Sequence, residues 1–172
     1  IANKAPLTKE ALQKAPGLKL ICIMATGYDN CDIGYCTQNG IKVANVRDYG
    51  TAMVAQHTIT LALALSQKLP FYDTYVKSGA YSRQTGFSFF SNPFNELDGK
   101  TWGIAGMGNI GGRVARIAEA LGCKIIVHSL TGKRNTAGYE QVDKDTLLSQ
   151  SDILSLHCPL SSLSLNFIDA AA

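Results

Sequence analysis

Short apolar runs alternate along this chain with segments whose apolar positions recur at helical spacing, and this alternation predicts the secondary structure. The first part of the chain predicts a helix capped by Thr8, a strand, a second helix capped by Asp29, and a second strand. These elements are expected over residues 8–14, 18–24, 30–38 and 41–45. The order helix, strand, helix, strand is typical of a parallel sheet with helical crossovers.

The middle of the chain predicts helices of another kind. Residues 51–68 are apolar on nearly every side, so we expect a long helix that is buried between layers or domains. Pro70 is expected to end that helix, and an aromatic helix is expected over residues 71–81. Residues 83–95 are rich in Phe, Ser and Asn and predict an irregular connection.

Residues 100–129 carry the most specific pattern in the chain. An apolar strand over 101–105 leads directly into closely spaced glycines, and an amphipathic helix follows as far as Leu121. A second strand is expected over 124–127. Beyond it, the sequence predicts a polar loop over 131–137, a short helix over 143–149 and a strand over 152–158.

The glycines Gly106, Gly108 and Gly111 have the spacing G-x-G-x-x-G between a strand and a helix. The first allows a tight turn, the second lets a pyrophosphate approach the backbone, and the third lets the helix pack close to the sheet. The start of the helix offers unpaired N–H groups to phosphates. The pattern therefore predicts a dinucleotide site, and the alternative is a glycine-rich turn in a flavodoxin-like sheet without a ligand.

Composition excludes several classes of function. A net charge of +3 over 172 residues, with no basic block, argues against a nucleic-acid partner. The longest apolar stretch, residues 53–65, is too short and too polar to span a membrane. Five cysteines without a pairing pattern indicate reduced thiols and a cytoplasmic location.

Two further groups of side chains resemble metal ligands in type but not in spacing. Asp29, Asn30 and Asp32 fit the start of a helix better than a metal site. Cys31 and Cys36 are five residues apart on the expected helix and should lie on different faces, which argues against a zinc pair. We therefore expect no metal site.

Four motifs in register resemble those of the D-isomer-specific 2-hydroxyacid dehydrogenases, nearest to the glycerate dehydrogenase and hydroxypyruvate reductase branch. They cover nearly the whole chain in the order that the family shows. The motifs are A-T-G-Y-D-N-C-D at 25–32, V-A-Q-H-T at 54–58, L-D-G-K-T-W-G-I-A-G-M-G-N-I-G at 97–111 and S-D-I-L-S-L-H-C-P-L at 151–160.

The resemblance implies an α/β fold of two domains. Residues 1–50 would be the latter part of a flavodoxin-like substrate domain. Residues 51–172 would be a Rossmann-type, doubly wound parallel sheet that binds a nicotinamide dinucleotide and is incomplete at its C-terminal side. The chain is thus expected to be incomplete, and the family implies a homodimer.

The resemblance also assigns site residues. The backbone of Thr26 and Gly27 would hold the substrate carboxylate, in agreement with a turn at the carboxyl end of a strand. Val54 would line the nicotinamide. The glycine turn, with Asn109 and Ile110, would hold the pyrophosphate. His157, Cys158 and Pro159 would border the adenosine half of the coenzyme.

The chemistry that the family implies is hydride transfer between the coenzyme and a small 2-keto or 2-hydroxy acid, with a His, an Arg and a Glu as catalytic residues. Those three are expected beyond Ala172, so no catalytic residue is assigned here and the chain alone should be inactive. His57, His128 and His157 do not match the catalytic histidine. A His157–Cys158 dyad is unfavourable because neighbours on a strand point to opposite faces.

Ser129 occupies the position where an NAD-specific site has an acidic residue. A serine hydroxyl followed by Lys133 and Arg134 suits a 2′-phosphate, which favours NADP while NAD remains possible. The alternative is that both cations are solvated loop charges and the enzyme tolerates either coenzyme.

A different class of function stays open for this fold. Some relatives act as coenzyme-sensing corepressors through partner contacts, without significant turnover. Rapid turnover of a keto acid would distinguish an enzyme from such a binding module. A methyltransferase is disfavoured by the intact glycine spacing.

Overall fold

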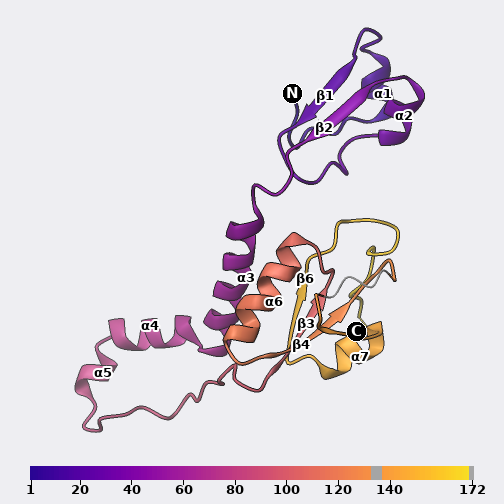
Figure 1. Ribbon diagram of the computed structural model, residues 1–172. Coiled ribbons are helices and arrows are strands. Elements are labelled where there is room, and N and C mark those ends of the chain that lie inside the picture. The colour runs from indigo at the N-terminus through magenta and orange to yellow at the C-terminus, as the bar shows by residue number, and fades with distance from the viewer. Residues whose placement is uncertain (133–136, 171–172) are drawn as a thin grey trace. The chain divides into compact units, whose positions relative to one another are not determined.

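The computed structural model describes residues 1–132 and 137–170, which form two compact units (Figure 1). The first unit comprises Ile1–Thr51 and Pro159–Leu165. The second comprises Ala52–Cys158 and the residues from Asn166 on.

The first unit is built on two parallel strands. β1 (Leu20–Ile23) pairs with β2 (Lys42–Asn45), so that Leu20 faces Lys42 and Ile23 faces Asn45. α1 (Lys9–Gln13) begins after the predicted Thr8 cap, and α2 (Ile33–Gln38) connects the strands. The predicted order of elements is confirmed. The buried core gathers side chains from α1, β1 and α2 and from the residues that precede α2 and β2: Leu12, Ile21, Ile23, Cys31, Cys36 and Ile41.

The expectation that Asp29 caps a helix starting at Asn30 is wrong. The helix starts at Ile33, and Asp32 is its cap, because the Asp32 Oδ1 atom accepts a hydrogen bond from the Tyr35 amide at 2.8 Å. The Asn30 side chain instead donates to the carbonyl oxygens of Asn3 and Ala5, each at 2.9 Å. These bonds tie the turn before the helix to the N-terminal segment.

The later helix start also changes the position of Cys31. Because Cys31 precedes the helix rather than lying on it, its sulfur turns toward Cys36, and the two Sγ atoms lie 3.8 Å apart. Both residues are buried in the core of the first unit. The expectation that these thiols face apart is therefore wrong.

The second unit contains a four-stranded parallel sheet in the order β5-β4-β3-β6. The helix α3 (Thr51–Ser66) leads into it, and α4 (Leu69–Lys77) and α5 (Ala80–Arg83) precede the sheet. The sheet and its helices then follow as β3 (Thr101–Ala105), α6 (Asn109–Ala120), β4 (Lys124–His128), β5 (Glu140–Gln141), α7 (Lys144–Gln150) and β6 (Ile153–Leu156).

Side chains on the two faces of the sheet enter separate cores. Ile104 and Val127 pack with α6 and with Ala55 and Ile59 of α3 on one face. On the other face, the neighbouring positions Ala105 and Ile126 pack with α7 and Phe167. Helices on both faces of a parallel sheet define a doubly wound α/β unit, as predicted.

One strand escaped prediction. β5 spans two exposed residues, Glu140 and Gln141, and pairs in parallel with β4. Its side chains carry no apolar alternation, so only the pairing with β4 defines it as a strand.

The expected burial of α3 on all sides is wrong for the described chain. Ala55 and Ile59 are buried, whereas Met53, Leu61 and Leu65 are exposed. α3 thus contributes a narrow stripe to the core and leaves an apolar surface uncovered. None of the described helices is long and apolar enough to cross a bilayer.

Pro70 begins a helix instead of ending one. α3 is followed by Lys68 in the left-handed region, with φ of 50°, and Pro70 lies in the first turn of α4, where its missing N–H costs nothing. Gly79, with φ of 73°, separates α4 from α5. The single helix expected over residues 71–81 is therefore wrong.

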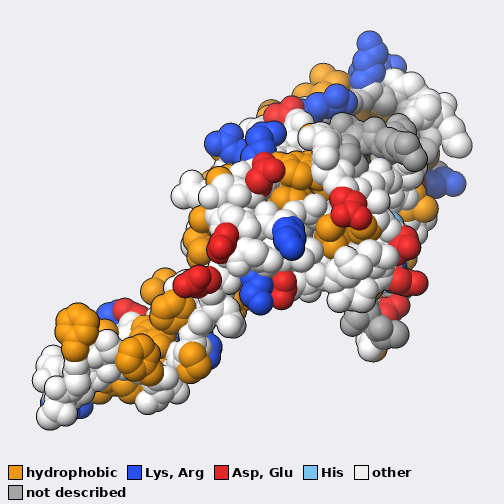
Figure 2. Space-filling model, turned by 60° about the horizontal axis from the view of Figure 1, so that its bottom comes forward, with side chains coloured by type: hydrophobic (Ala, Val, Ile, Leu, Met, Phe, Trp, Pro, Cys, Tyr) orange, Lys and Arg blue, Asp and Glu red, His pale blue; other side chains and the backbone are white. Residues whose placement is uncertain are grey.

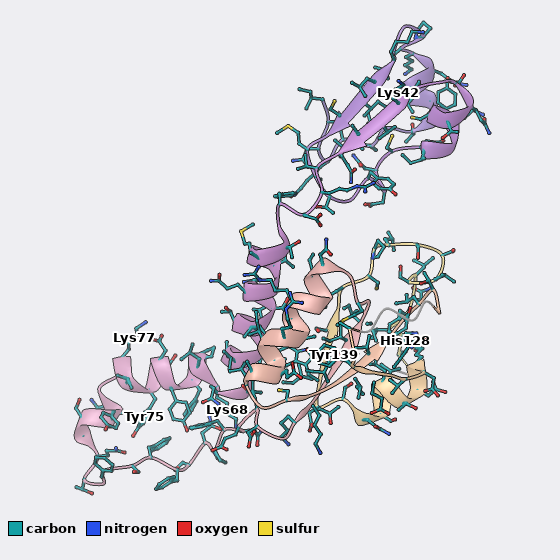
Figure 3. All side chains as sticks on the ribbon, in the orientation of Figure 1. Lys42, Lys68, Tyr75, Lys77, His128 and Tyr139 are labelled. Atoms are coloured by element: carbon teal, nitrogen blue, oxygen red, sulfur yellow. The ribbon has the colours of Figure 1, made fainter. Side chains whose placement is uncertain are left out.

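The segment from α4 to Asn95, which we call the aromatic arm, is held by ring contacts. Tyr75 points toward the returning chain (Figure 3), stacks on Phe89 with ring centroids 4.2 Å apart, and donates to Gln84 Oε1 at 3.0 Å. The returning chain, residues 84–94, has no helix or strand, as predicted.

Candidate functional site

The strand register brings three loops to one edge of the sheet. Ala105, the last residue of β3, faces His128 of β4 on one side and Leu156 of β6 on the other. The residues that follow these strands are Gly106, Ser129 and His157. All three were predicted from the sequence as coenzyme residues, and the sheet places them at its carboxyl edge, where ligands of open α/β sheets bind.

Gly106 makes the tight turn that leaves β3. Its φ is +97°, and its N–H donates to the carbonyl oxygen of His128 at 3.0 Å. A Cβ atom here would lie 2.9 Å from the amide nitrogen of Cys158 and from the carbonyl carbon of His157. Both the backbone angle and the neighbouring chain therefore require glycine.

Gly108 and Gly111 differ in the space around them: Gly108 borders open space, and Gly111 is closely packed. A Cβ atom at Gly108 would meet no atom within 4 Å, and the residue is exposed. A Cβ at Gly111 would clash with the carbonyl oxygen of Gly106 and lie 3.3 Å from the Ile104 side chain. Gly111 thus allows α6 to pack on β3, while the space at Gly108 is open for a ligand.

The start of α6 offers hydrogen-bond donors to that space. Gly108 is the N-cap, no side chain makes a capping hydrogen bond there, and the first turn holds no acidic residue. Asn109 is exposed and Ile110 is half-buried in this turn. The amide groups and the dipole of a twelve-residue helix favour an anion at this end. The residues present fit a pyrophosphate.

Ser129 follows β4 and is half-buried. Its carbonyl oxygen accepts a hydrogen bond from Gly132 at 3.1 Å, which turns the chain directly after the strand. Ser129 directly follows His128, whose carbonyl oxygen accepts from the Gly106 amide, and its predicted ribose contact stays a prediction. Lys133 and Arg134, predicted to share that contact, lie outside the described residues.

His157 follows β6 and is fixed by two hydrogen bonds. Its N–H donates to the carbonyl oxygen of Ala105 at 2.8 Å, and its ring Nε2 lies 3.0 Å from Ser155 Oγ. Burial lowers the pKa of His157. The ring partner among the described residues is Ser155, so a His157–Cys158 dyad has no support.

Cys158 brings its backbone close to the glycine turn. The Cys158 amide nitrogen lies against Gly106, as described above. Pro159 directly follows Cys158 in the sequence, and its predicted role toward the adenosine half of the coenzyme stays a prediction.

Val54 lies on the exposed side of α3. Its carbonyl oxygen accepts a hydrogen bond from Thr58 Oγ1 at 2.9 Å, within the helix. The predicted role of Val54 toward the nicotinamide stays a prediction.

Thr26 and Gly27 form an exposed turn after β1 in the first unit. The turn is held by Asn45, whose side chain donates to the Thr26 carbonyl oxygen at 2.7 Å, and by Thr26 Oγ1, which donates to the Val46 carbonyl oxygen at 3.2 Å. Within the described part of the chain, the amide N–H groups of Thr26 and Gly27 donate no hydrogen bond. These amides can serve an anion, although the Asp29 carboxylate lies close, 3.1 Å from where a Gly27 Cβ would stand.

The other two histidines, His57 and His128, lie on a helix and at the end of a strand. His57 is exposed on α3, which corrects the expectation that it is buried. His128 ends β4, as predicted, and its Nδ1 lies 3.0 Å from the Val142 carbonyl oxygen. Figure 3 labels His128 beside the sheet.

Sequence reasoning missed the buried pair that stands behind the site. Trp102 Nε1 donates to Ser155 Oγ at 2.9 Å, in the interior of the second unit. The available signal was a single serine in an otherwise apolar strand, I-L-S-L, because a buried hydroxyl needs a partner.

This fold and this glycine turn define a Rossmann-type nucleotide-binding unit. A family model described as "D-isomer specific 2-hydroxyacid dehydrogenase, NAD binding domain" matches residues 59–172. The chain belongs to that family.

Two curated relatives illustrate the similarity. A hydroxypyruvate reductase from Blautia hydrogenotrophica is 38% identical over 162 residues, which cover 92% of this chain and 50% of the relative. A glycerate dehydrogenase from Methylorubrum extorquens is 35% identical over 168 residues, covering 98% and 52%. The chain therefore spans about half the length of these relatives.

Two solved structures share the fold. A D-lactate dehydrogenase from Aquifex aeolicus, complexed with NAD and lactic acid, has a TM-score of 0.83 and 34% identity over 94% of this chain and 48% of its own. An acyclic imino acid reductase in complex with NADPH and D-Arg has a TM-score of 0.84 and 33% identity, covering 93% and 50%. Nicotinamide coenzymes of both kinds thus occur among the structural relatives.

Proposed function

We propose that the complete protein is an oxidoreductase that transfers a hydride between NAD(P)H and a small 2-keto or 2-hydroxy acid of the hydroxypyruvate, glyoxylate or glycerate type. The observation that carries this proposal is the contrast within the glycine turn. Gly106 and Gly111 are closed by neighbouring atoms, whereas Gly108 borders open space at an uncapped helix start. That combination suits a diphosphate, and family membership supports the nicotinamide.

We assign the second unit to the coenzyme and the first unit to the acid. The amides of Thr26 and Gly27 would hold the acid's carboxylate, since they donate to no group in the described chain. The bound nicotinamide would supply the hydride. The chain's own residues would bind and orient the coenzyme: the amides at the start of α6 would hold the pyrophosphate beside Gly106, against which the His157–Cys158 peptide lies.

The coenzyme preference that we propose is NADPH over NADH. Ser129 beside the glycine turn carries no charge, so it does not repel a 2′-phosphate as an aspartate would. The sequence adds Lys133 and Arg134 close behind it. A hydrogen bond to a charged group contributes roughly 1.5–3 kcal/mol, equivalent to a preference of about ten- to a hundredfold.

We further propose a homodimer that uses the aromatic arm. Phe87 and Phe90 on the arm are 94% and 83% exposed, and Leu69 and Val76 of α4 are also exposed. Figure 2 shows hydrophobic side chains gathered on this segment, at the lower left. A gathering of exposed apolar side chains of this kind is typical of a protein interface. The five free thiols support a reducing, cytoplasmic location.

Turnover assays on the complete protein test the proposed function. We expect hydroxypyruvate or glyoxylate to cause loss of reduced-nicotinamide absorbance, faster with NADPH than with NADH. The matched control is Gly108→Val, which should fold normally and require at least tenfold more coenzyme for the same rate of turnover. Coenzyme binding without turnover of any small keto acid would contradict the enzyme and support a coenzyme-sensing binding module.

A further inference from the structure

Three side chains from two strands and a loop are linked by hydrogen bonds behind the glycine turn. Trp102 of β3 is fully buried, and its Nε1 donates to Ser155 Oγ of β6 at 2.9 Å. Ser155 is also buried, and its Oγ lies 3.0 Å from Nε2 of His157. This series of hydrogen bonds between Trp102, Ser155 and His157, which we call the relay, therefore runs from the centre of the sheet to the rim of the proposed coenzyme site.

The chemistry of the indole group fixes the direction of the first hydrogen bond, and the tautomer of His157 decides the direction of the second. An indole N–H can only donate, so the Ser155 oxygen accepts from Trp102. The single hydroxyl hydrogen of Ser155 is then available to His157, and Nε2 can accept it when the ring is neutral and carries its hydrogen on Nδ1. Burial lowers the pKa of His157 and thereby favours the same neutral ring.

The backbone of His157 transmits this arrangement to the site. Its N–H is held by the Ala105 carbonyl oxygen at 2.8 Å, and its carbonyl carbon stands 2.9 Å from the position of a Gly106 Cβ. Ring and backbone are thus fixed independently, one through Ser155 and the other through the end of β3. The His157–Cys158 peptide is held against the turn on which the pyrophosphate would rest.

We propose that Ser155 is a positioning residue for the coenzyme: it links Trp102 to His157, keeps the hydrogen of His157 on Nδ1, and holds the wall that faces Gly106. The proposal rests on the proposed function, because the coenzyme is the ligand that is positioned. Trp102, the one tryptophan of the chain, reports the state of this relay.

Coenzyme affinity of Ser155→Ala in the complete protein is the first test. Removing one hydrogen-bonding group should raise the dissociation constant for NADPH about two- to tenfold. Ser155→Thr, which keeps the hydroxyl, should restore the affinity. Ser151→Ala is the matched control, because Ser151 stands just before the same strand and donates to the Leu147 carbonyl oxygen outside the relay. Equal affinities for Ser155→Ala and Ser151→Ala would overturn the proposal.

Nitrogen NMR without coenzyme is the second test. In ¹⁵N-labelled protein, the one indole N–H resonance should shift in Ser155→Ala and stay unchanged in Ser151→Ala. The imidazole nitrogens of His157 should show hydrogen on Nδ1 in the wild type and a mixture of tautomers in Ser155→Ala. Hydrogen on Nε2 in the wild type would overturn the relay. If the wild type binds no coenzyme while these NMR results hold, the proposed function fails and the relay geometry stands.

Discussion

Gly106 lies against the peptide that follows His157, so closely that a Cβ atom on Gly106 would stand 2.9 Å from the His157 carbonyl carbon. This contact joins the turn after β3 to the segment after β6. Both segments border the proposed pyrophosphate position, so the geometry of the site depends on the absence of a side chain at residue 106.

Gly106→Ala should destabilise the fold. A non-glycine residue at φ of +97° is strained, and the added methyl group overlaps the backbone of His157 and Cys158. Together these effects should lower the free energy of unfolding by about 2–4 kcal/mol. Urea denaturation measures the loss. Gly17→Ala serves as control, because a Cβ atom there meets nothing within 4 Å; equal stability of the two variants would contradict the packing described.

Ser129→Asp should reverse the coenzyme preference. A carboxylate after β4 can accept hydrogen bonds from ribose hydroxyls and repels a 2′-phosphate. We expect the dissociation constant for NADPH to rise about ten- to a hundredfold while that for NADH falls or stays the same. Fluorescence titration with both reduced coenzymes measures this, with Ser129→Asn as the uncharged control. Tighter NADH binding by the wild type would contradict the proposed preference.

Cys31 should resist alkylation in the folded protein. Burial, with a contribution from the neighbouring Cys36 thiol, raises the pKa of Cys31 to about 11. Near pH 8 only about one thousandth of this thiol is ionised, and the fraction rises with pH toward that pKa. Iodoacetamide followed by peptide mass spectrometry should therefore label the half-buried Cys22 and Cys158 first. Labelling in urea is the control, and native labelling of Cys31 at the rate of Cys22 would refute the buried pair.

The aromatic arm should control the oligomeric state. The double variant Phe87→Ser, Phe90→Ser removes two rings that are almost fully exposed, so it should leave the fold intact and shift a dimer toward monomer. Light scattering coupled to size exclusion gives the mass. Replacing both residues by Tyr keeps the rings and should keep the dimer. A wild-type monomer, or a dimer that is indifferent to both Ser substitutions, would exclude the arm as the interface.

The strand and helix around the glycine turn could be predicted from patterns among neighbouring residues. β3 occupies residues 101–105 as predicted, and the predicted helix α6 begins directly after Gly108, because apolar periodicity and glycine spacing are properties of adjacent residues. Gly106, Ser129 and His157 were each predicted separately. Their common position at the edge of the sheet depends on strand order, which the parallel alternation implied.

Features that depend on distant partners could not be predicted from the sequence in this way. Asp29 and Asp32 are equally good caps by residue type, and the bonds from Asn30 to the N-terminal segment decide between them. β5 is a strand only because β4 lies beside it. The bond between Trp102 and Ser155 joins residues 53 positions apart, so no local spacing reveals it.

Coenzyme titration of Gly108→Val against the wild type, by calorimetry on the complete protein, tests the central claim most directly. Because a Cβ atom at Gly108 would meet no atom within 4 Å, the variant should unfold at the same urea concentration as the wild type. The same side chain would occupy the position of the pyrophosphate, so NADPH and NADH should both bind at least tenfold more weakly, a loss of about 1.4 kcal/mol or more. Undiminished binding by a stable Gly108→Val protein would contradict the assignment of this turn to the coenzyme.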